Sequence, residues 1–197
     1  MPRKIRSWCC GVAASGLLWS AAPAHAADKI EWNLSVWGNP RGFTRGIEEM
    51  AKLADQGSGG NFTIKIHYGS TVSPEKENLD ALKVGAVEAA MICSFYHPGK
   101  NPVLSALDLP FLPILDIDAN HDVKAAYYAH PEAVREGEKW NAMWFFPAVV
   151  PRFEFMGVGK APRELADWDG MRIRAPGGIG EALARIGAVP SSGTASE

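Results

Sequence analysis

Two hydrophobic periods alternate along the first half of this sequence, and their alternation constrains the fold more than any other feature. An apolar side chain occupies every second position in residues 30–36 and again in residues 62–68, the pattern of a half-buried β-strand. Helical spacing of apolar residues lies between them in residues 43–54, and a second helix is predicted over residues 74–85. Residues 87–93 are nearly all apolar, as in a strand covered on both faces. This order predicts an α/β fold with a mostly parallel sheet and right-handed crossovers.

The second half repeats the alternation less regularly. Residues 118–140 are predicted to be helical with an interruption near Pro131, and residues 144–150 to form an apolar strand. The pattern then restarts with a strand over residues 171–175 and a helix whose apolar stripe covers residues 179–186. We therefore expect a second unit to begin after residue 150.

The amino terminus has the composition of a secretory signal peptide. Arg3, Lys4 and Arg6 precede a short apolar run over residues 8–22, and Ala-His-Ala at residues 24–26 is a typical cleavage site. The run is too short for a membrane-spanning helix, and a buried amino-terminal helix would not explain the order of basic, apolar and small residues. We predict that residues 1–26 are removed and that the mature protein begins at Ala27 in the periplasm.

Charge and cysteine content limit which partners the protein can bind and how its fold can be stabilised. The formal charge of the whole sequence is 20 − 22 = −2, and loss of the three basic residues of the leader gives 17 − 22 = −5. A mildly acidic chain without a basic block is a poor partner for nucleic acid. Only Cys93 remains after cleavage, so the mature fold cannot contain an intramolecular disulfide. Its stability must come from a hydrophobic core.

Aromatic residues follow the predicted strands where a parallel sheet binds its ligands. Ligands bind outside the carboxyl ends of such strands. Trp37 follows the first strand, Gly69-Ser70-Thr71 the second, and Phe95 and Tyr96 the third. These loops predict a partly apolar small-molecule pocket, although each ring could instead cap the core.

No familiar catalytic or metal motif is present. The sequence lacks G-x-S-x-G, H-E-x-x-H and a phosphate-binding loop, and Gly178-x-Gly180 lacks the third glycine of a dinucleotide fingerprint. Residues 132–139 mix charges like a solvated helix face. We expect no catalytic residues, no cofactor and no metal. A secreted α/β hydrolase stays open as an alternative, because a catalytic triad can be scattered in sequence.

Several segments together resemble the extracytoplasmic solute receptor of tripartite ATP-independent periplasmic (TRAP) transporters, of the C4-dicarboxylate-binding type. The resemblance rests on residues 73–88, 93–100, 107–113, 169–176 and 186–190, in that order. It implies a two-lobed periplasmic binding protein-like fold that closes around an organic acid and delivers it to the sodium-coupled membrane subunits of a TRAP transporter. A ligand-sensing module of a signalling protein with the same fold is a further alternative.

The resemblance also implies how the chain divides. Residues 27–150 correspond to the first α/β lobe, and residues 151–197 to a crossover strand and the start of the second lobe. The family's chain continues beyond this point, so we expect the second lobe to be truncated and the helix after residues 171–175 to lack its next sheet partners.

Two arginines are the candidate ligands for a carboxylate. In the family, the second arginine of the motif formed here by residues 172–176 makes a salt bridge with the substrate carboxylate, which implies this role for Arg174. A guanidinium suits it, because it offers a carboxylate two parallel donors. Arg172 and Arg174 share one strand face opposite Ile173, and we expect Arg172 to be solvated. Arg152 is a weaker candidate that could pair with Glu154 instead.

Four aromatic side chains complete the predicted site: Trp37, Phe95, Tyr96 and Phe111. They suit a flat or partly apolar monocarboxylate, but the same loops could line a pocket for a dicarboxylate. The sequence leaves this choice open.

Overall fold

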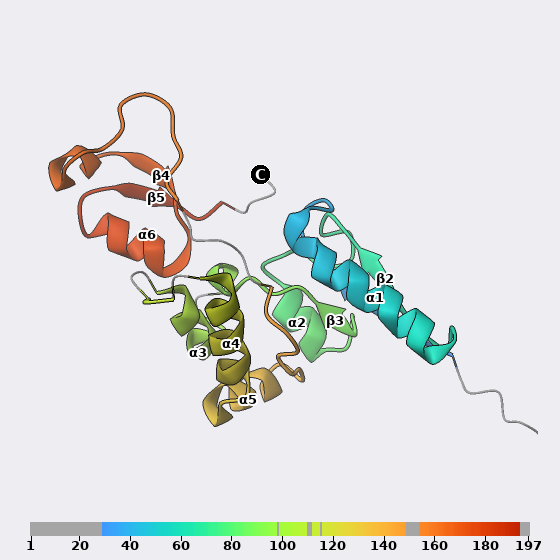
Figure 1. Ribbon diagram of the computed structural model, residues 1–197. Coiled ribbons are helices and arrows are strands. Elements are labelled where there is room, and N and C mark those ends of the chain that lie inside the picture. The colour runs from blue at the N-terminus through green and yellow to red at the C-terminus, as the bar shows by residue number, and fades with distance from the viewer. Residues whose placement is uncertain (1–28, 98, 110–111, 115, 149–153, 194–197) are drawn as a thin grey trace, which may run out of the picture.

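A computed structural model of the chain describes residues 29–97, 99–109, 112–114, 116–148 and 154–193 (Figure 1). Two separate sheets organise these residues, one of three strands and one of two. The predicted signal peptide and the predicted boundary near residue 150 lie outside the described residues. Among the described residues, every helix is too short or too polar to cross a membrane.

The larger sheet is parallel, as predicted. Its strands β1 (Ile30–Ser35), β2 (Phe62–His67) and β3 (Ala89–Ala90) have the order β2-β1-β3. β1 pairs with β2 from Ile30↔Phe62 to Ser35↔His67, and only its last two residues pair with β3. The chain therefore crosses β1 on its way from β2 to β3, and the carboxyl end of β1 becomes the centre of the sheet edge.

Only the carboxyl half of β1 is buried. Leu34 and Val36 form a core with Ile47 of helix α1 (Arg45–Ser58), whereas Ile30 and Trp32 at the start of the strand are exposed. The predicted burial of alternate side chains is therefore confirmed in the carboxyl half of β1, whereas the apolar side chains of its amino half face solvent. Helix α1 follows the short 3₁₀ turn η1 (Gly42–Thr44) and ends at Ser58, before a left-handed Gly59.

The connection from β2 to β3 contains a shorter helix than predicted. Helix α2 (Asn78–Lys83) begins four residues later, because Glu77 N donates to Pro74 O in a preceding turn. Its first residue, Asn78, is fully buried and accepts a hydrogen bond from Ser35 Oγ at 3.0 Å. This tertiary contact fixes α2 beside β1.

A group of short helices packs beside the sheet. It consists of η2 (Ser94–Tyr96), α3 (Pro102–Ser105), η3 (Ala106–Asp108), α4 (Ile117–Tyr128) and α5 (Pro131–Glu138). The predicted interruption near Pro131 is confirmed: His130 is the N-cap of α5, and its Nδ1 accepts a hydrogen bond from Glu132 N. Glu136 is 1% exposed, so the prediction of a solvated face over residues 132–139 is wrong at that position.

Two predicted strands differ from the structure. The strand over residues 87–93 shrinks to Ala89–Ala90, because the Glu88 carboxylate accepts the Asn33 N–H at 2.7 Å in place of a backbone acceptor. Residues 144–148 form no strand, and no strand among the described residues runs beside them. Trp144 Nε1 instead donates to Ala133 O at 2.8 Å, which ties this segment to α5.

The smaller sheet is a complete parallel pair. β4 (Arg172–Arg174) pairs with β5 (Val189–Ser191), and α6 (Gly177–Ala184) crosses between them. Ala175, Leu183 and Ala188 form the core of this unit. The expectation that the helix after β4 lacks its next sheet partner is wrong, because β5 supplies one. A turn η4 (Leu165–Trp168) precedes β4.

Candidate functional site

Arg174 is the last residue of β4 and projects to the exposed side of the small sheet. Arg172 and Arg174 are both exposed, and Ile173 between them packs on the core, as predicted. Arg174 Nε donates to Gly193 O at 2.9 Å, and its Nη2 donates to the hydroxyl of Tyr96 at 3.5 Å. No carboxylate among the described residues forms an ion pair with Arg174. The guanidinium is thus oriented but keeps donors for another acceptor.

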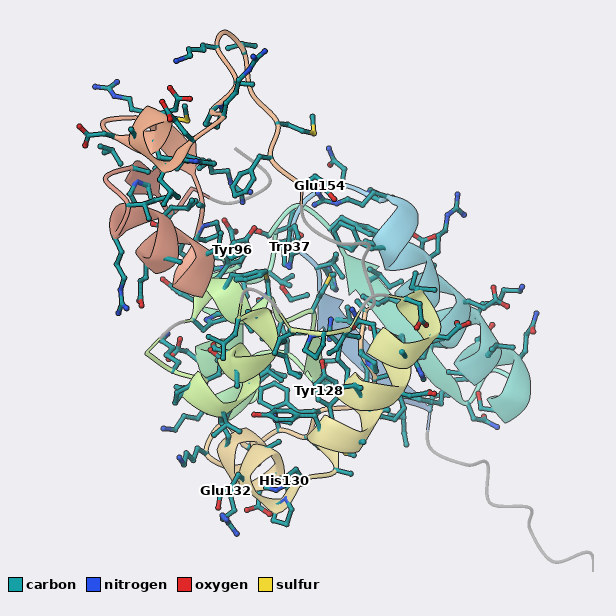
Figure 2. All side chains as sticks on the ribbon, turned by 60° about the vertical axis from the view of Figure 1, so that its left-hand side comes forward. Trp37, Tyr96, Tyr128, His130, Glu132 and Glu154 are labelled. Atoms are coloured by element: carbon teal, nitrogen blue, oxygen red, sulfur yellow. The ribbon has the colours of Figure 1, made fainter. Side chains whose placement is uncertain are left out.

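Tyr96 connects this arginine to the edge of the larger sheet. It belongs to η2, the next element after β3, and is 8% exposed. Its ring lies 5.6 Å from that of Trp37 in an edge-to-face arrangement, and Figure 2 shows the two side chains next to each other. Trp37 follows β1 by two residues and is also buried. Tyr96 thus links Trp37, after the end of β1, to Arg174, at the end of β4, and we call this region the junction of the two sheets.

Phe95 lies at the contact between the two units. The first turn of α6 packs against it so closely that a Cβ on Gly177 would sit 3.1 Å from Phe95 Cδ1. Gly177 also has φ +60°, a conformation that side chains other than glycine rarely adopt. Glycine at this position therefore allows the chain to turn out of β4 directly against η2.

The remaining two predicted residues, Phe111 and Arg152, lie outside the described residues. Their proposed contacts, and the competing Arg152–Glu154 pair, stay predictions.

Arg41 is a residue of this site that the sequence analysis missed. Its guanidinium carbon lies 4.7 Å from the ring centroids of both Trp37 and Phe43. Arg41 Nη2 donates to Trp37 O at 3.1 Å, and Nε donates to Asn39 O at 3.2 Å. The residue belongs to an irregular loop without periodicity, so only its position shortly after the aromatic residue at the end of β1 could have indicated it.

Two partly buried acidic groups lie near Tyr96 in the chain: Cys93 directly before η2 and Asp108 in η3. Burial raises the pKa of the Asp108 carboxyl to about 6, although a hydrogen bond from Ser94 and the charge of Lys124 oppose this shift. Burial and the charge of Asp108 raise the pKa of the Cys93 thiol to about 12. A thiol that stays protonated at neutral pH is a poor nucleophile. No cluster of three or more potential metal-binding side chains occurs in the described part of the chain.

The buried Asp108 predicts a specific pH dependence of stability. Its pKa in the folded protein lies above the unfolded value near 3.9, so the folded state binds this proton more tightly and the contribution of Asp108 to stability falls as pH rises from about 4 to about 6. Asp108→Asn should therefore raise the free energy of unfolding at pH 7 by about 2 kcal/mol and change it little at pH 4. Urea unfolding at several pH values measures this. Equal effects at both pH values would contradict it.

A hollow on the larger unit is poorly suited to bind an acid. It is lined by Trp32, Leu82, Val87 and Glu88, near the amino ends of the strands. The Glu88 carboxylate is held there by the backbone and side chain of Asn33, and these hydrogen bonds keep its pKa below the ordinary value. Its negative charge would repel a carboxylate ligand.

Known proteins of one family match most of the chain. The model of the family "bacterial extracellular solute-binding protein, family 7" matches residues 37–197. A monocarboxylate 2-oxoacid-binding periplasmic protein of Nostoc sp. is 26% identical over 162 residues, which are 80% of this chain and 43% of that protein.

Solved structures share the fold. A TRAP periplasmic solute binding protein from Pseudoalteromonas atlantica, with bound sodium and pyruvate, has a TM-score of 0.64 at 22% identity over 86% of this chain and 52% of its own. A marine metagenome TRAP solute binding protein in complex with pyroglutamate has a TM-score of 0.69 at 19% identity over 86% of this chain and 55% of its own. The chain thus spans about half the length of these relatives. The extent of the family match shows that the chain belongs to family 7 of the bacterial extracellular solute-binding proteins.

Proposed function

We propose that this protein is a periplasmic receptor that captures an organic acid through its carboxylate and delivers it to the membrane subunits of a TRAP transporter. One observation carries the proposal: Arg174 is oriented at the junction of the two sheets by Tyr96 and Gly193 but has no carboxylate partner among the described residues. Its place at the carboxyl end of β4 is where parallel sheets bind ligands.

The binding mode follows from the donors at this junction. The free N–H groups of the Arg174 guanidinium would donate to the two oxygens of the carboxylate. The Tyr96 hydroxyl accepts from Arg174 and so helps to hold the guanidinium in place. Trp37 and Phe95 would form apolar walls, and the predicted residues Phe111 and Arg152 would complete the pocket.

The relatives support an acidic ligand. The Nostoc protein is named for 2-oxoacids, and the solved structures were obtained with pyruvate or pyroglutamate. The predicted signal peptide would direct export of this protein and be cleaved before residue 27. This would place the protein with the other extracellular members of its family. The family consists of solute-binding proteins, and the neutral Cys93 thiol offers no nucleophile, so the secreted hydrolase is not favoured.

A thermal-unfolding scan of the full mature protein tests the proposal. We expect one or more organic acids at millimolar concentration to raise the melting temperature by several degrees, because a ligand at a hundred times its Kd stabilises by about 2.7 kcal/mol. The primary amide of each acid serves as the control and should give no shift, since it lacks the charge that Arg174 recognises. A cooperative transition that no acid shifts, or equal shifts with acid and amide, would refute carboxylate capture.

A further inference from the structure

The hollow beside Glu88 lies where the larger sheet is incomplete. β3 pairs with β1 only from Leu34 onward, so the preceding part of β1 has no strand on that side. The turn that follows α2 passes there instead and leaves a hollow of about 300 Å³. Its apolar lining consists of Trp32, Leu82 and Val87.

The Glu88 carboxylate is fixed in this hollow through one of its two oxygens. Oε2 accepts the backbone N–H of Asn33 at 2.7 Å and its side-chain Nδ2–H at 3.3 Å. The Asn33 amide is itself oriented, because its Oδ1 accepts from His67 Nε2 at 2.8 Å. The hydrogen bonds from Asn33, above all that of the backbone, lower the pKa of Glu88, so the group is charged at neutral pH. No described residue donates to Oε1, which stays available to a donor.

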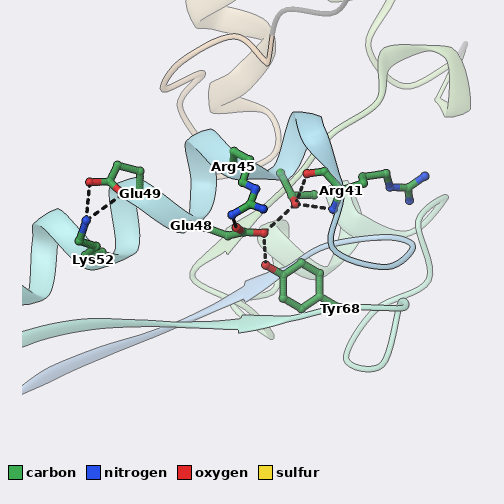
Figure 3. Close-up of polar contacts among 7 residues, drawn as sticks. Arg41, Arg45, Glu48, Glu49, Lys52 and Tyr68 are labelled. Atoms are coloured by element: carbon green, nitrogen blue, oxygen red, sulfur yellow. Dashed lines mark hydrogen bonds and ion pairs between the residues drawn. The ribbon is translucent and has the colours of Figure 1, made fainter.

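No cation in the described part of the chain neutralises this carboxylate. Glu88 takes part in none of the ion pairs among these residues. The nearest lysine along the chain, Lys83, instead lies over Trp140, with Nζ 5.4 Å from the ring centroid. On α1, by contrast, Glu49 is paired with Lys52 at 3.0 Å (Figure 3). The charge of Glu88 is therefore left for a cation from outside the described chain.

Trp32 adds an aromatic ring to the same hollow. Its side chain is 39% exposed, and the Phe62 ring packs edge-to-face against it with the centroids 5.0 Å apart. An aromatic ring attracts a cation, and a carboxylate oxygen accepts strong hydrogen bonds from an ammonium group. The hollow thus combines a fixed negative charge, an aromatic ring and an apolar lining, which together suit a cation that carries an alkyl chain.

We propose that this hollow binds a small organic cation, an alkylammonium whose N–H groups donate to Glu88 Oε1 and whose chain packs on Trp32, Leu82 and Val87. The hollow lies near the amino ends of the strands, whereas Trp37 and Tyr96 follow their carboxyl ends. The inference therefore does not depend on carboxylate capture by Arg174. It adds a second site with a ligand of opposite charge.

Titration of the wild-type mature protein with hexylammonium and with 1-hexanol, followed by ¹H–¹⁵N NMR, tests this inference. The alcohol has the same chain without the charge. We expect hexylammonium to shift the signals of Trp32, Gly85 and Glu88 and to bind about tenfold or more tightly than hexanol, the effect of one charge-assisted contact. Glu88→Gln should bring the two affinities to within about twofold of each other. The glutamine oxygen can still accept the Asn33 N–H, so the hollow should persist.

Glu49→Gln is the matched control, because it removes the same charge from an exposed glutamate on α1. It should preserve the preference for hexylammonium. Equal affinities of amine and alcohol for the wild type would overturn the inference without the use of any variant. A preference that survives Glu88→Gln, or shifts confined to other parts of the protein, would overturn it as well. Carboxylate capture is tested separately by the panel of acids and is affected by none of these results.

Discussion

Arg174→Ala is expected to remove most of the affinity of the protein for the organic acid that we propose it binds. If Arg174 holds the carboxylate as proposed, the variant loses a charge-assisted, two-donor contact, which should cost on the order of 2–4 kcal/mol, or about 30- to 1,000-fold in Kd. Tyr96 would keep its hydroxyl but lose the guanidinium that donates to it at 3.5 Å. Calorimetric titration of the acid that stabilises the wild type most measures this loss.

Two further variants separate the roles of charge and geometry. Arg174→Lys retains the charge but offers a single ammonium group in place of the planar pair of donors, so its affinity should lie between those of wild type and Arg174→Ala. Arg172→Ala removes the same charge two residues away on the same exposed face, and should change Kd by less than about twofold. Equal losses for Arg172→Ala and Arg174→Ala would mean that the effect is one of net charge alone.

Glu136→Ala is expected to destabilise the fold more than any substitution at the site. The side chain is 1% exposed, and its carboxylate accepts the backbone N–H groups of Val103 and Leu104 at 2.7 and 2.8 Å. These donors lie in the first turn of α3, where no earlier carbonyl in the helix can pair with them. Alanine would leave both unsatisfied, with an expected loss of about 3 kcal/mol in the free energy of unfolding, measured by urea denaturation.

Helix α5, which contains Glu136, also provides the control for this effect. Glu132 is exposed and pairs with Arg135 one turn away, so Glu132→Ala should cost less than about 0.5 kcal/mol. For Glu136→Gln, the loss in the free energy of unfolding should lie between the losses for Glu136→Ala and Glu132→Ala. The amide oxygen of glutamine accepts from one N–H while its NH₂ group faces the other. A loss for Glu136→Ala as small as that for Glu132→Ala would show that the two N–H groups find other partners.

The parallel sheet could be predicted because its cause is local. Alternation in residues 30–36 and 62–68 fixes the strands, and the helix between them forces a parallel crossover. Strand β5 could not be predicted, since three residues with a central Pro190 carry no strand period, and their pairing depends on α6 returning the chain beside β4. Glu136 was misjudged for a related reason: a mixed-charge helix reveals nothing of the two N–H groups that α3 brings to it.

The residues of the candidate site were likewise only partly predictable from the sequence. Arg174 was predicted because its motif at the end of a strand has a recognisable form, and Tyr96 and Trp37 because they follow strands of one parallel sheet. Arg41 was not predicted, because its position depends on the left-handed turn at Gly38 and on two rings that meet only in the folded chain. Sequence patterns thus indicate the sheet edge that carries the candidate site, whereas loop conformation decides which side chains gather there.

A crystal structure of the full mature protein with its acid tests carboxylate capture at the junction of the two sheets most directly. We expect both carboxylate oxygens within hydrogen-bonding distance of the Arg174 guanidinium, with the Trp37 ring beside the ligand. An acid bound away from this junction, or bound there without contact to Arg174, would contradict the account.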